Sequence, residues 1–159
     1  MSVHVYLSLG SNLNQPQEQI KTAFAELNQL PFTRLLKQSG LWTSQPIGPQ
    51  DQPDFVNAAA LIATQLEPLA LLDELQALER LHQRVKTRHW GERTLDIDII
   101  CYDQQFLRSP RLNLPHPEAK NRAFVLLPLM QLNPELHLPK QGTIADLAKQ
   151  VADQEIYPI

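Results

Sequence analysis

Cysteine and glycine are scarce in this chain. The single cysteine, Cys101, excludes an internal disulfide and any zinc site built from several cysteines, and its place in an apolar run predicts a packing role. The chain has five glycines and no G-x-x-x-x-G-K-[ST] motif, so a glycine-rich loop around phosphate is not expected. Basic side chains or metal ions would have to hold any phosphate ligand.

The chain also lacks an excess of positive charge and a long apolar run. Its net charge of -3 gives no general attraction to nucleic acid or to anionic membranes. The first residues resemble neither a signal peptide nor a membrane span. We therefore expect a cytoplasmic protein with no nucleic-acid or membrane partner. We also expect it to be a monomer. A length of 159 residues with 43% hydrophobic content predicts one domain over 1–159.

Hydrophobic periodicity predicts the order of the elements. Strands are expected at 3–9, 32–43, 55–63 and 94–101, and helices at 16–30 and 68–85. This β-α-β-β-α-β order is that of a ferredoxin-like α+β sandwich. We expect the strand over 94–101 to be central in its sheet.

The remaining residues predict a C-terminal helical extension. A short helix is expected over 122–127 and an edge strand over 136–138. Thr143 and Asp146 have the spacing of a capping pair for a last helix.

The strand over 94–101 carries two carboxylates on one face. Side chains alternate across a strand, so Asp96 and Asp98 point the same way, with Cβ atoms roughly 6–7 Å apart. Like charges on a half-buried face repel unless a cation or a donor lies between them. The pattern favours a cation-binding pair, although solvated carboxylates are the commoner arrangement for a D-x-D motif. The opposite face would carry Leu95, Ile97, Ile99 and Cys101.

A cluster of basic residues precedes this strand. Between positions 80 and 93 the chain has one acidic residue, Glu92, and five basic ones, Arg80, Arg84, Lys86, Arg88 and Arg93. Cations suit a helix C-terminus, which accounts for some of them. Two carboxylates facing several cations are also what a magnesium-bound polyphosphate requires, because Mg2+ is commonly held by one or two carboxylates together with phosphate oxygens.

Residues 44–54 contain three prolines and a glycine, which predicts either a binding loop or a plain surface loop. Phe55 and Asn57 follow and would project from one face of the next strand. The Asn57 amide needs a partner there, either in a neighbouring strand or in a ligand. His116 lies between two prolines, so we expect it in an extended loop and not in the core.

Four motifs follow one another along nearly the whole chain. They are Gly10-Ser11-Asn12, the run from Pro46 to Asn57, Arg93-Thr94-Leu95-Asp96-Ile97-Asp98-Ile99, and Leu114-Pro115-His116-Pro117. In this order they resemble the 6-hydroxymethyl-7,8-dihydropterin pyrophosphokinase family. The resemblance implies transfer of pyrophosphate from ATP to the hydroxymethyl group of the pterin, release of AMP, and a place in folate biosynthesis.

The resemblance also implies roles for individual residues. Asp96 and Asp98 would bind two magnesium ions, and Arg84 and Arg93 would act with them as catalytic residues. ATP, the co-substrate, would be contacted by Glu79, Arg84, Trp90, Arg93, Ile99, Arg111, His116 and Arg122. The pterin would lie in a slot formed by Ser44, Ile47, Phe55, Asn57 and Phe124, with the two phenylalanines stacked on its faces.

The chain departs from the family pattern at three sites. Ser44-Gln45 stands where the pattern often has Thr-Pro, Lys86 where a second arginine is common, and Glu92 where a proline usually precedes Arg93. Lys86 offers a point charge in place of a bidentate fork, and the Glu92 carboxylate is expected to point away from the phosphates. None of the three removes a group that the chemistry requires.

Two other kinds of protein are compatible with parts of the pattern. A palm-like two-metal nucleotidyl transferase also places carboxylates on ferredoxin-like strands, but the acidic balance argues against the nucleic-acid channel it would need. A non-catalytic ferredoxin-like module that binds RNA or a small ligand would present aromatic residues on its sheet, whereas this strand presents aspartates. Titration of ATP with and without magnesium would separate these interpretations.

Overall fold

The structure, a computed structural model, describes residues 1–45, 52–82 and 94–159. Its first elements are β1 (Val3–Ser11), α1 (Pro16–Leu27), β2 (Thr33–Gln38), β3 (Trp42–Ser44), β4 (Phe55–Thr64), α2 (Pro68–Leu81) and β5 (Asp96–Tyr102). The later ones are β6 (Leu107–Arg108), β7 (Asn113–Leu114), the 3-10 helix η1 (Ala119–Asn121), α3 (Ala123–Leu132), β8 (His137–Leu138), β9 (Gly142–Thr143), α4 (Ile144–Gln150) and β10 (Ile156–Pro158).

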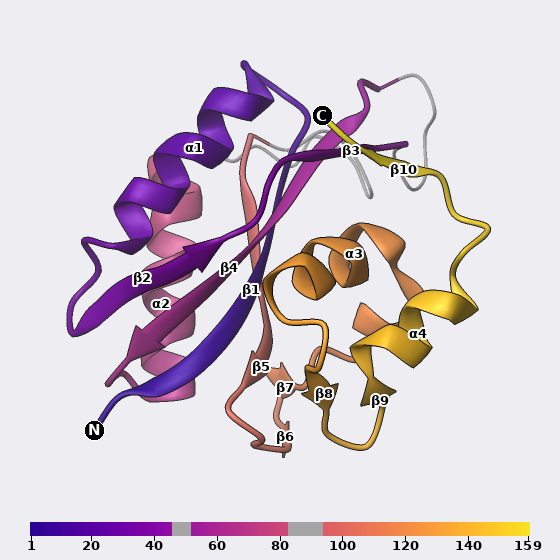
Figure 1. The fold of residues 1–159 in the computed structure, drawn as a ribbon. Helices are drawn as coiled ribbons and strands as arrows, with labels where there is room; N and C mark the ends of the chain where they lie inside the picture. The colour runs from indigo at the N-terminus through magenta and orange to yellow at the C-terminus, as the bar shows by residue number, and fades with distance from the viewer. Residues whose placement is uncertain (46–51, 83–93) are drawn as a thin grey trace.

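One antiparallel sheet joins most of the strands. Its order is β10-β3-β4-β1-β5, and β2 also pairs with β4. Figure 1 shows α1 and α2 on one side of this sheet and α3 and α4 on the other. The predicted ferredoxin-like α+β sandwich with a C-terminal helical extension is confirmed.

Each face of the sheet packs against its own apolar core. Ile20 of α1 and Leu75 of α2 are fully buried in the first core, and Leu126 of α3 is fully buried in the second. Because strand side chains alternate, β4 supplies both cores, with Ile62 in the first and Leu61 in the second. The sheet is therefore fixed from both sides.

Proline and threonine mark three helix starts. Pro16 and Pro68 lie in the first turn of α1 and α2, where a backbone N–H has no intrahelical partner in any case. The Thr143 hydroxyl accepts a hydrogen bond from the Asp146 backbone N–H at 3.3 Å, so the predicted cap of the last helix is confirmed.

Three helices differ in length from their predictions. α1 ends at Leu27, three residues before its predicted end. α2 ends at Leu81, and Val85, which was expected in it, lies outside the described residues. α3 extends past 127 to Leu132. The buried side chains of Leu129 and Leu132 continue its apolar surface beyond Pro128, and their burial maintains the helix there.

The predicted strand over 32–43 is in fact two strands. β2 and β3 are separated at Ser39, whose backbone N–H donates to the Ala59 carbonyl at 2.9 Å and whose hydroxyl accepts from the Ala59 N–H at 2.8 Å. A side chain thus takes the place of a main-chain acceptor in the ladder, and the strand is interrupted there. The chain then enters β3, which pairs with both β4 and β10.

The carboxylate strand lies at an edge of the sheet, so the prediction that it is central was wrong. Within the described strands, β5 pairs with β1 and ends the sheet. The reason is topological, because the helix α2 carries the chain across the first core and β5 then adds beside β1. An edge position leaves alternate backbone N–H groups of β5 without a strand partner.

A β-bulge alters which face the end of β5 presents. Cys101 was expected beside Ile97 and Ile99 but lies in the second core with Ile100. The register shifts at the Tyr6–Leu7 step, which leaves Ile100 as the extra residue and reverses the alternation. Burial raises the pKa of the Cys101 thiol to about 12, as expected for a side chain that serves packing.

Candidate active site

Asp96 and Asp98 lie on the face of β5 that is turned away from α1 and α2. Between them, Ile97 is buried in the core under those helices. In the ladder with β1, Asp96 is opposite Gly10 and Asp98 is opposite Ser8. Both aspartates are half-buried. The structure therefore brings them to one face, as alternation along the strand predicts.

A pocket of about 300 Å3 opens beside the two aspartates. Its lining includes four residues that were expected to contact the nucleotide: Glu79, Ile99, Arg111 and His116. Arg122 was also expected there but is not part of this lining. Its guanidinium instead lies over the Phe124 ring, 5.7 Å from the ring centroid.

Glu79 of α2 is buried. Its Oε2 accepts a hydrogen bond from the Ile97 backbone N–H at 2.8 Å. Ile97 lies between the two aspartates on an edge strand, where this N–H needs a partner other than a strand. Glu79 thus fixes the part of β5 that carries the carboxylates.

His116 is held beside β5 by its backbone. Its N–H donates to the Ile100 carbonyl at 2.8 Å, and its Nδ1 accepts from the Glu118 N–H at 3.1 Å. An accepting Nδ1 leaves the Nε2 N–H as the donor of the neutral ring. Burial, followed by the positive charge of Arg122, lowers the pKa of the His116 imidazole, and Glu118 and Asp96 partly oppose this.

Arg111 lies at the pocket and contacts α2. Its Nη2 donates to Asp73 Oδ1 at 2.6 Å and to Gln76 Oε1 at 3.2 Å. Both partners of the ion pair are largely exposed, and such pairs contribute little to stability. The guanidinium can therefore exchange its carboxylate for a phosphate at small cost.

Three of the residues expected to bind the pterin, Ser44, Phe55 and Asn57, lie on the same face of the sheet as the two aspartates. Asn57 of β4 is opposite Gly10 of β1, and a Cβ added at Gly10 would lie 3.7 Å from Asn57 Oδ1 and 3.8 Å from Phe55 Cδ1. Asn57 Nδ2 donates to Ser44 Oγ of β3 at 2.6 Å. Gly10 is also the residue opposite Asp96. One glycine therefore lies between the amide and the carboxylates.

Phe124 comes from the first turn of α3. It lines a cavity of about 410 Å3 together with Ser44 of β3, so α3 and β3 form two of its walls. Ile47, expected in the same slot, lies outside the described residues. The structure therefore brings Phe124 and Ser44 together, and Asn57 is linked to them through its hydrogen bond with Ser44.

Arg84, Trp90 and Arg93 lie outside the described residues, as do the unusual Lys86 and Glu92. Their roles stay predictions from the resemblance.

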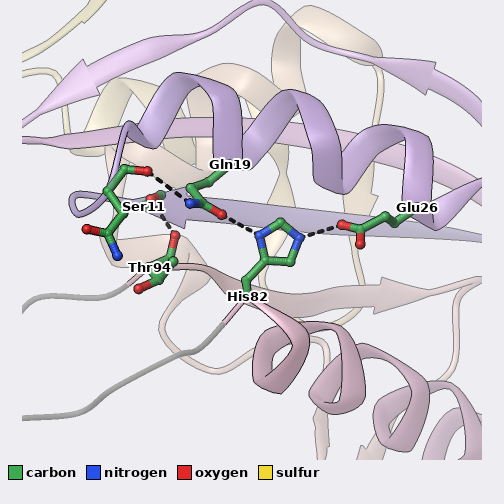
Figure 2. Close-up of polar contacts among 6 residues, drawn as sticks. Ser11, Gln19, Glu26, His82 and Thr94 are labelled. Atoms are coloured by element: carbon green, nitrogen blue, oxygen red, sulfur yellow. Dashed lines mark hydrogen bonds and ion pairs between the residues drawn. The ribbon is translucent and has the colours of Figure 1, made fainter.

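Polar contacts hold the chain on both sides of positions 83–93, and of their residues only Ser11 and Thr94 belong to motifs seen in the sequence. Figure 2 shows His82 between two side chains of α1, with Nδ1 against Gln19 Oε1 and Nε2 against Glu26 Oε1. On the far side, the Ser11 hydroxyl donates to the Thr94 carbonyl. The last residue of β1 and the helix α1 therefore hold the chain before and after these positions.

Asn12 of the Gly10-Ser11-Asn12 motif is buried and holds the last part of the loop over 44–54. Its Nδ2 donates to Gln52 Oε1 and to the Pro53 carbonyl, each at 2.9 Å. In the sequence, the motif Gly10-Ser11-Asn12 was the signal that could have pointed to the contacts of Ser11 and Asn12.

The aspartate pair fits a magnesium ion shared with a ligand. Across 1–45, 52–82 and 94–159, no three His, Cys, Asp or Glu side chains come together in a way that could hold a metal ion. Mg2+ prefers oxygen donors, keeps several waters and is commonly bound by one or two carboxylates plus substrate phosphates. Two neighbouring carboxylates therefore suit magnesium held jointly with a polyphosphate.

The fold and the site define an α+β protein of ferredoxin-like topology with an acidic pair on its edge strand. The family model for 7,8-dihydro-6-hydroxymethylpterin-pyrophosphokinase matches residues 6–134. The chain belongs to this family, and the predicted membership is confirmed.

Named relatives extend the match to nearly the whole chain. A 2-amino-4-hydroxy-6-hydroxymethyldihydropteridine pyrophosphokinase of Haemophilus influenzae is 47% identical over 154 residues, which are 97% of this chain and 96% of the relative. A protein of the same name from Pseudomonas aeruginosa is 51% identical over 147 residues, 92% of this chain and 91% of the relative.

A solved structure supports the fold. Plasmodium falciparum HPPK-DHPS matches with a TM-score of 0.75 at 14% identity, over 96% of this chain and 46% of that longer chain. At this identity the likeness concerns the fold alone. Separately, none of the helices in the described ranges is long and apolar enough to cross a membrane.

Proposed function

We propose that one face of the sheet holds both substrates, with ATP at the β5 edge and the pterin between β3, β4 and α3. Family membership assigns the reaction: pyrophosphate passes from ATP to the hydroxymethyl group of 6-hydroxymethyl-7,8-dihydropterin, and AMP is released, as a step of folate biosynthesis. The position of Gly10, between Asp96 and Asn57, carries the proposed arrangement. A residue without a side chain leaves room there for the reacting groups to meet.

Asp96 and Asp98 are proposed to hold two magnesium ions. Their spacing along the strand suits two neighbouring ions, which lie about 3.5–4 Å apart in two-metal sites. Bound magnesium would neutralise the phosphates and align the attacking and leaving oxygens. In this arrangement Glu79 keeps β5 in place through the Ile97 N–H, and the aspartates orient the polyphosphate.

Cationic and polar side chains are proposed to bind the rest of the nucleotide. Arg111 and His116 line the pocket beside the aspartates, and a neutral His116 can donate its Nε2 proton to a nucleotide oxygen. Arg84 and Arg93 are proposed as the catalytic arginines on the resemblance of their motif, because charge on a transferring group is stabilised by such side chains. Trp90, Ile99 and Arg122 complete the proposed nucleotide contacts.

The pterin is proposed to lie between aromatic side chains with an amide at its edge. A pterin is a flat heterocycle with donors and acceptors around its ring, so Phe55 and Phe124 suit its faces and Asn57 suits its edge. Ser44 holds the Asn57 amide, and Ile47 is proposed to complete the slot. The hydroxymethyl group would then be directed toward Gly10 and the aspartates.

We propose that residues 1–159 form a single domain, which is supported by strands that contribute to both cores. That the protein is a cytoplasmic monomer and binds no nucleic acid stays a prediction from the sequence.

Direct assay of the nucleotide product tests the function. The chain is incubated with ATP, magnesium and 6-hydroxymethyl-7,8-dihydropterin, and the products are separated to distinguish AMP from ADP. Pyrophosphate transfer yields AMP in equal amount to the pyrophosphorylated pterin, and omission of the pterin or chelation of magnesium should abolish it. Formation of ADP, or pterin-independent release of AMP, would contradict the proposed reaction.

A further inference from the structure

A short segment near the C-terminus connects two walls of the cavity that Phe124 and Ser44 line. We call residues 153–158 the C-terminal strap. Ile156 of the strap is paired with Ser44 in the ladder between β10 and β3, and Gln154 contacts the start of α3. Residues 153–156 line the cavity of about 410 Å3. The strap lies beyond residues 6–134, which the family model matches.

The Gln154 side-chain amide spans the junction between η1 and α3. Its Nε2 donates to the Asn121 carbonyl at 2.8 Å, and its Oε1 accepts from the Ala123 N–H at 2.8 Å. One group is a donor and the other an acceptor, so the two contacts define the orientation of the amide. The two partners, Asn121 and Ala123, are the sequence neighbours of Arg122, the residue that precedes α3.

Gln154 supplies a hydrogen-bond acceptor that no residue at the start of α3 provides. Arg122 occupies the N-cap position of α3 and makes no side-chain hydrogen bond to the helix. The first N–H groups of a helix have no intrahelical acceptor, and Ala123, whose N–H is the first of them, is buried. Gln154 therefore caps α3 from a distant part of the chain and fixes the turn that carries Phe124.

We propose that Gln154 is a positioning residue for the pterin, which acts by holding Phe124 at the correct distance from β3. The proposal rests on the proposed function of the slot. Within the strap, Gln154 holds the α3 wall and Ile156 holds the β3 wall, so the stretch between them sets the separation of the two walls. Stacking depends on close contact, because dispersion attraction is optimal at about 3.5–4.0 Å and a gap of 0.5–1 Å already removes a large part of it.

The test replaces Gln154 with leucine, which is similar in size but forms neither hydrogen bond. Calorimetric titration should show a dissociation constant for the pterin about tenfold higher, since two hydrogen bonds that fix the helix start are lost. Affinity for a magnesium–ATP analogue should change by less than about twofold. Gln154→Glu, which keeps an acceptor for the Ala123 N–H, should show a smaller loss.

Gln150→Leu is the matched control, because Gln150 is exposed at the end of α4. It should bind the pterin as the wild-type chain does. Melting curves of every variant establish whether the fold is retained. If Gln154→Leu does not fold, the pterin dissociation constant of Gln154→Glu tests the proposal.

A double-mutant cycle with Phe124→Ala separates positioning from general stability. If Gln154 acts through Phe124, the double variant should lose no more pterin affinity than Phe124→Ala alone. Additive losses, an equal loss of ATP-analogue affinity, or unchanged pterin affinity in folded Gln154→Leu would overturn the proposal. Wild-type affinity in Phe124→Ala would overturn the pterin slot itself, whereas a loss in Phe124→Ala without one in Gln154→Leu would reject only the role of the strap.

Discussion

Asn57 donates a hydrogen bond from its side-chain amide to the Ser44 hydroxyl at 2.6 Å, across the neighbouring strands β4 and β3. Both residues are buried. The bond uses an N–H of the amide, while the amide oxygen lies on the side of Gly10. Asn57 can therefore join the two strands and also present a hydrogen-bonding group to a ligand, so the two alternatives considered from the sequence are compatible.

Asn57→Ala should weaken pterin binding more than Ser44→Ala does. Loss of the amide leaves a group of the pterin unpaired in a closed site, which costs about 1–3 kcal/mol, whereas Ser44→Ala leaves the amide in place. Calorimetric titration with the pterin and with an ATP analogue measures both effects. Equal pterin losses in the two variants, together with equal falls in melting temperature, would mean that Asn57 only joins the strands.

Asp96→Ala and Asp98→Ala should each lower the rate of AMP formation by on the order of a thousandfold or more at saturating magnesium. The reason is that each carboxylate is proposed to bind metal directly. The fold should be retained, because removing one of two neighbouring like charges relieves repulsion. Asp103→Asn is a suitable control, since Asp103 is exposed in the turn after β5. Near-normal turnover in either alanine variant would remove the metal assignment.

Glu79→Ala should lower the free energy of unfolding by about 1–3 kcal/mol, because it removes the acceptor for the Ile97 N–H at the edge of the sheet. Glu79→Gln keeps an oxygen acceptor and should cost less. Urea unfolding monitored by circular dichroism measures both. Arg80→Ala, at the exposed neighbouring position, is the control, and an equal loss there would show that the effect belongs to the helix end and not to this bond.

The element order and the carboxylate pair could be predicted because both depend on local periodicity. Alternation over a few residues is enough to place Asp96 and Asp98 on one face, and it holds in the structure. The edge position of β5 and the bulge at Ile100 could not be predicted this way, since both depend on pairing with β1, far away in the sequence.

Site residues that act through single polar contacts left little signal in the sequence. Glu79 falls near the apolar stripe of its helix, yet its partner is a backbone N–H on β5 that no pattern identifies. Gln154 lies in a short segment without periodicity, and its two partners precede it by about thirty residues. Such contacts are determined by the tertiary structure.

His116 should make stability fall as the solution becomes acidic. Its pKa is lowered in the folded chain, chiefly by burial and then by the charge of Arg122, from an ordinary value of 6.5. Between that value and the lowered pKa, the unfolded chain binds a proton on this ring that the folded chain does not, so acidification favours unfolding. Well above 6.5 the ring is neutral in both states and contributes no pH dependence.

His116→Gln, which cannot titrate, should therefore lose less stability than the wild-type chain when the pH is lowered from about 7.5 to about 5.5. Thermal unfolding at the two pH values measures the difference. His137→Gln is the matched control, because His137 is exposed on β8 and its replacement should leave the wild-type pH dependence in place. If His116→Gln retains the full loss of stability, other groups cause the acid sensitivity, and His116 is not the neutral ring that the hydrogen bond from the Glu118 N–H to its Nδ1 indicates.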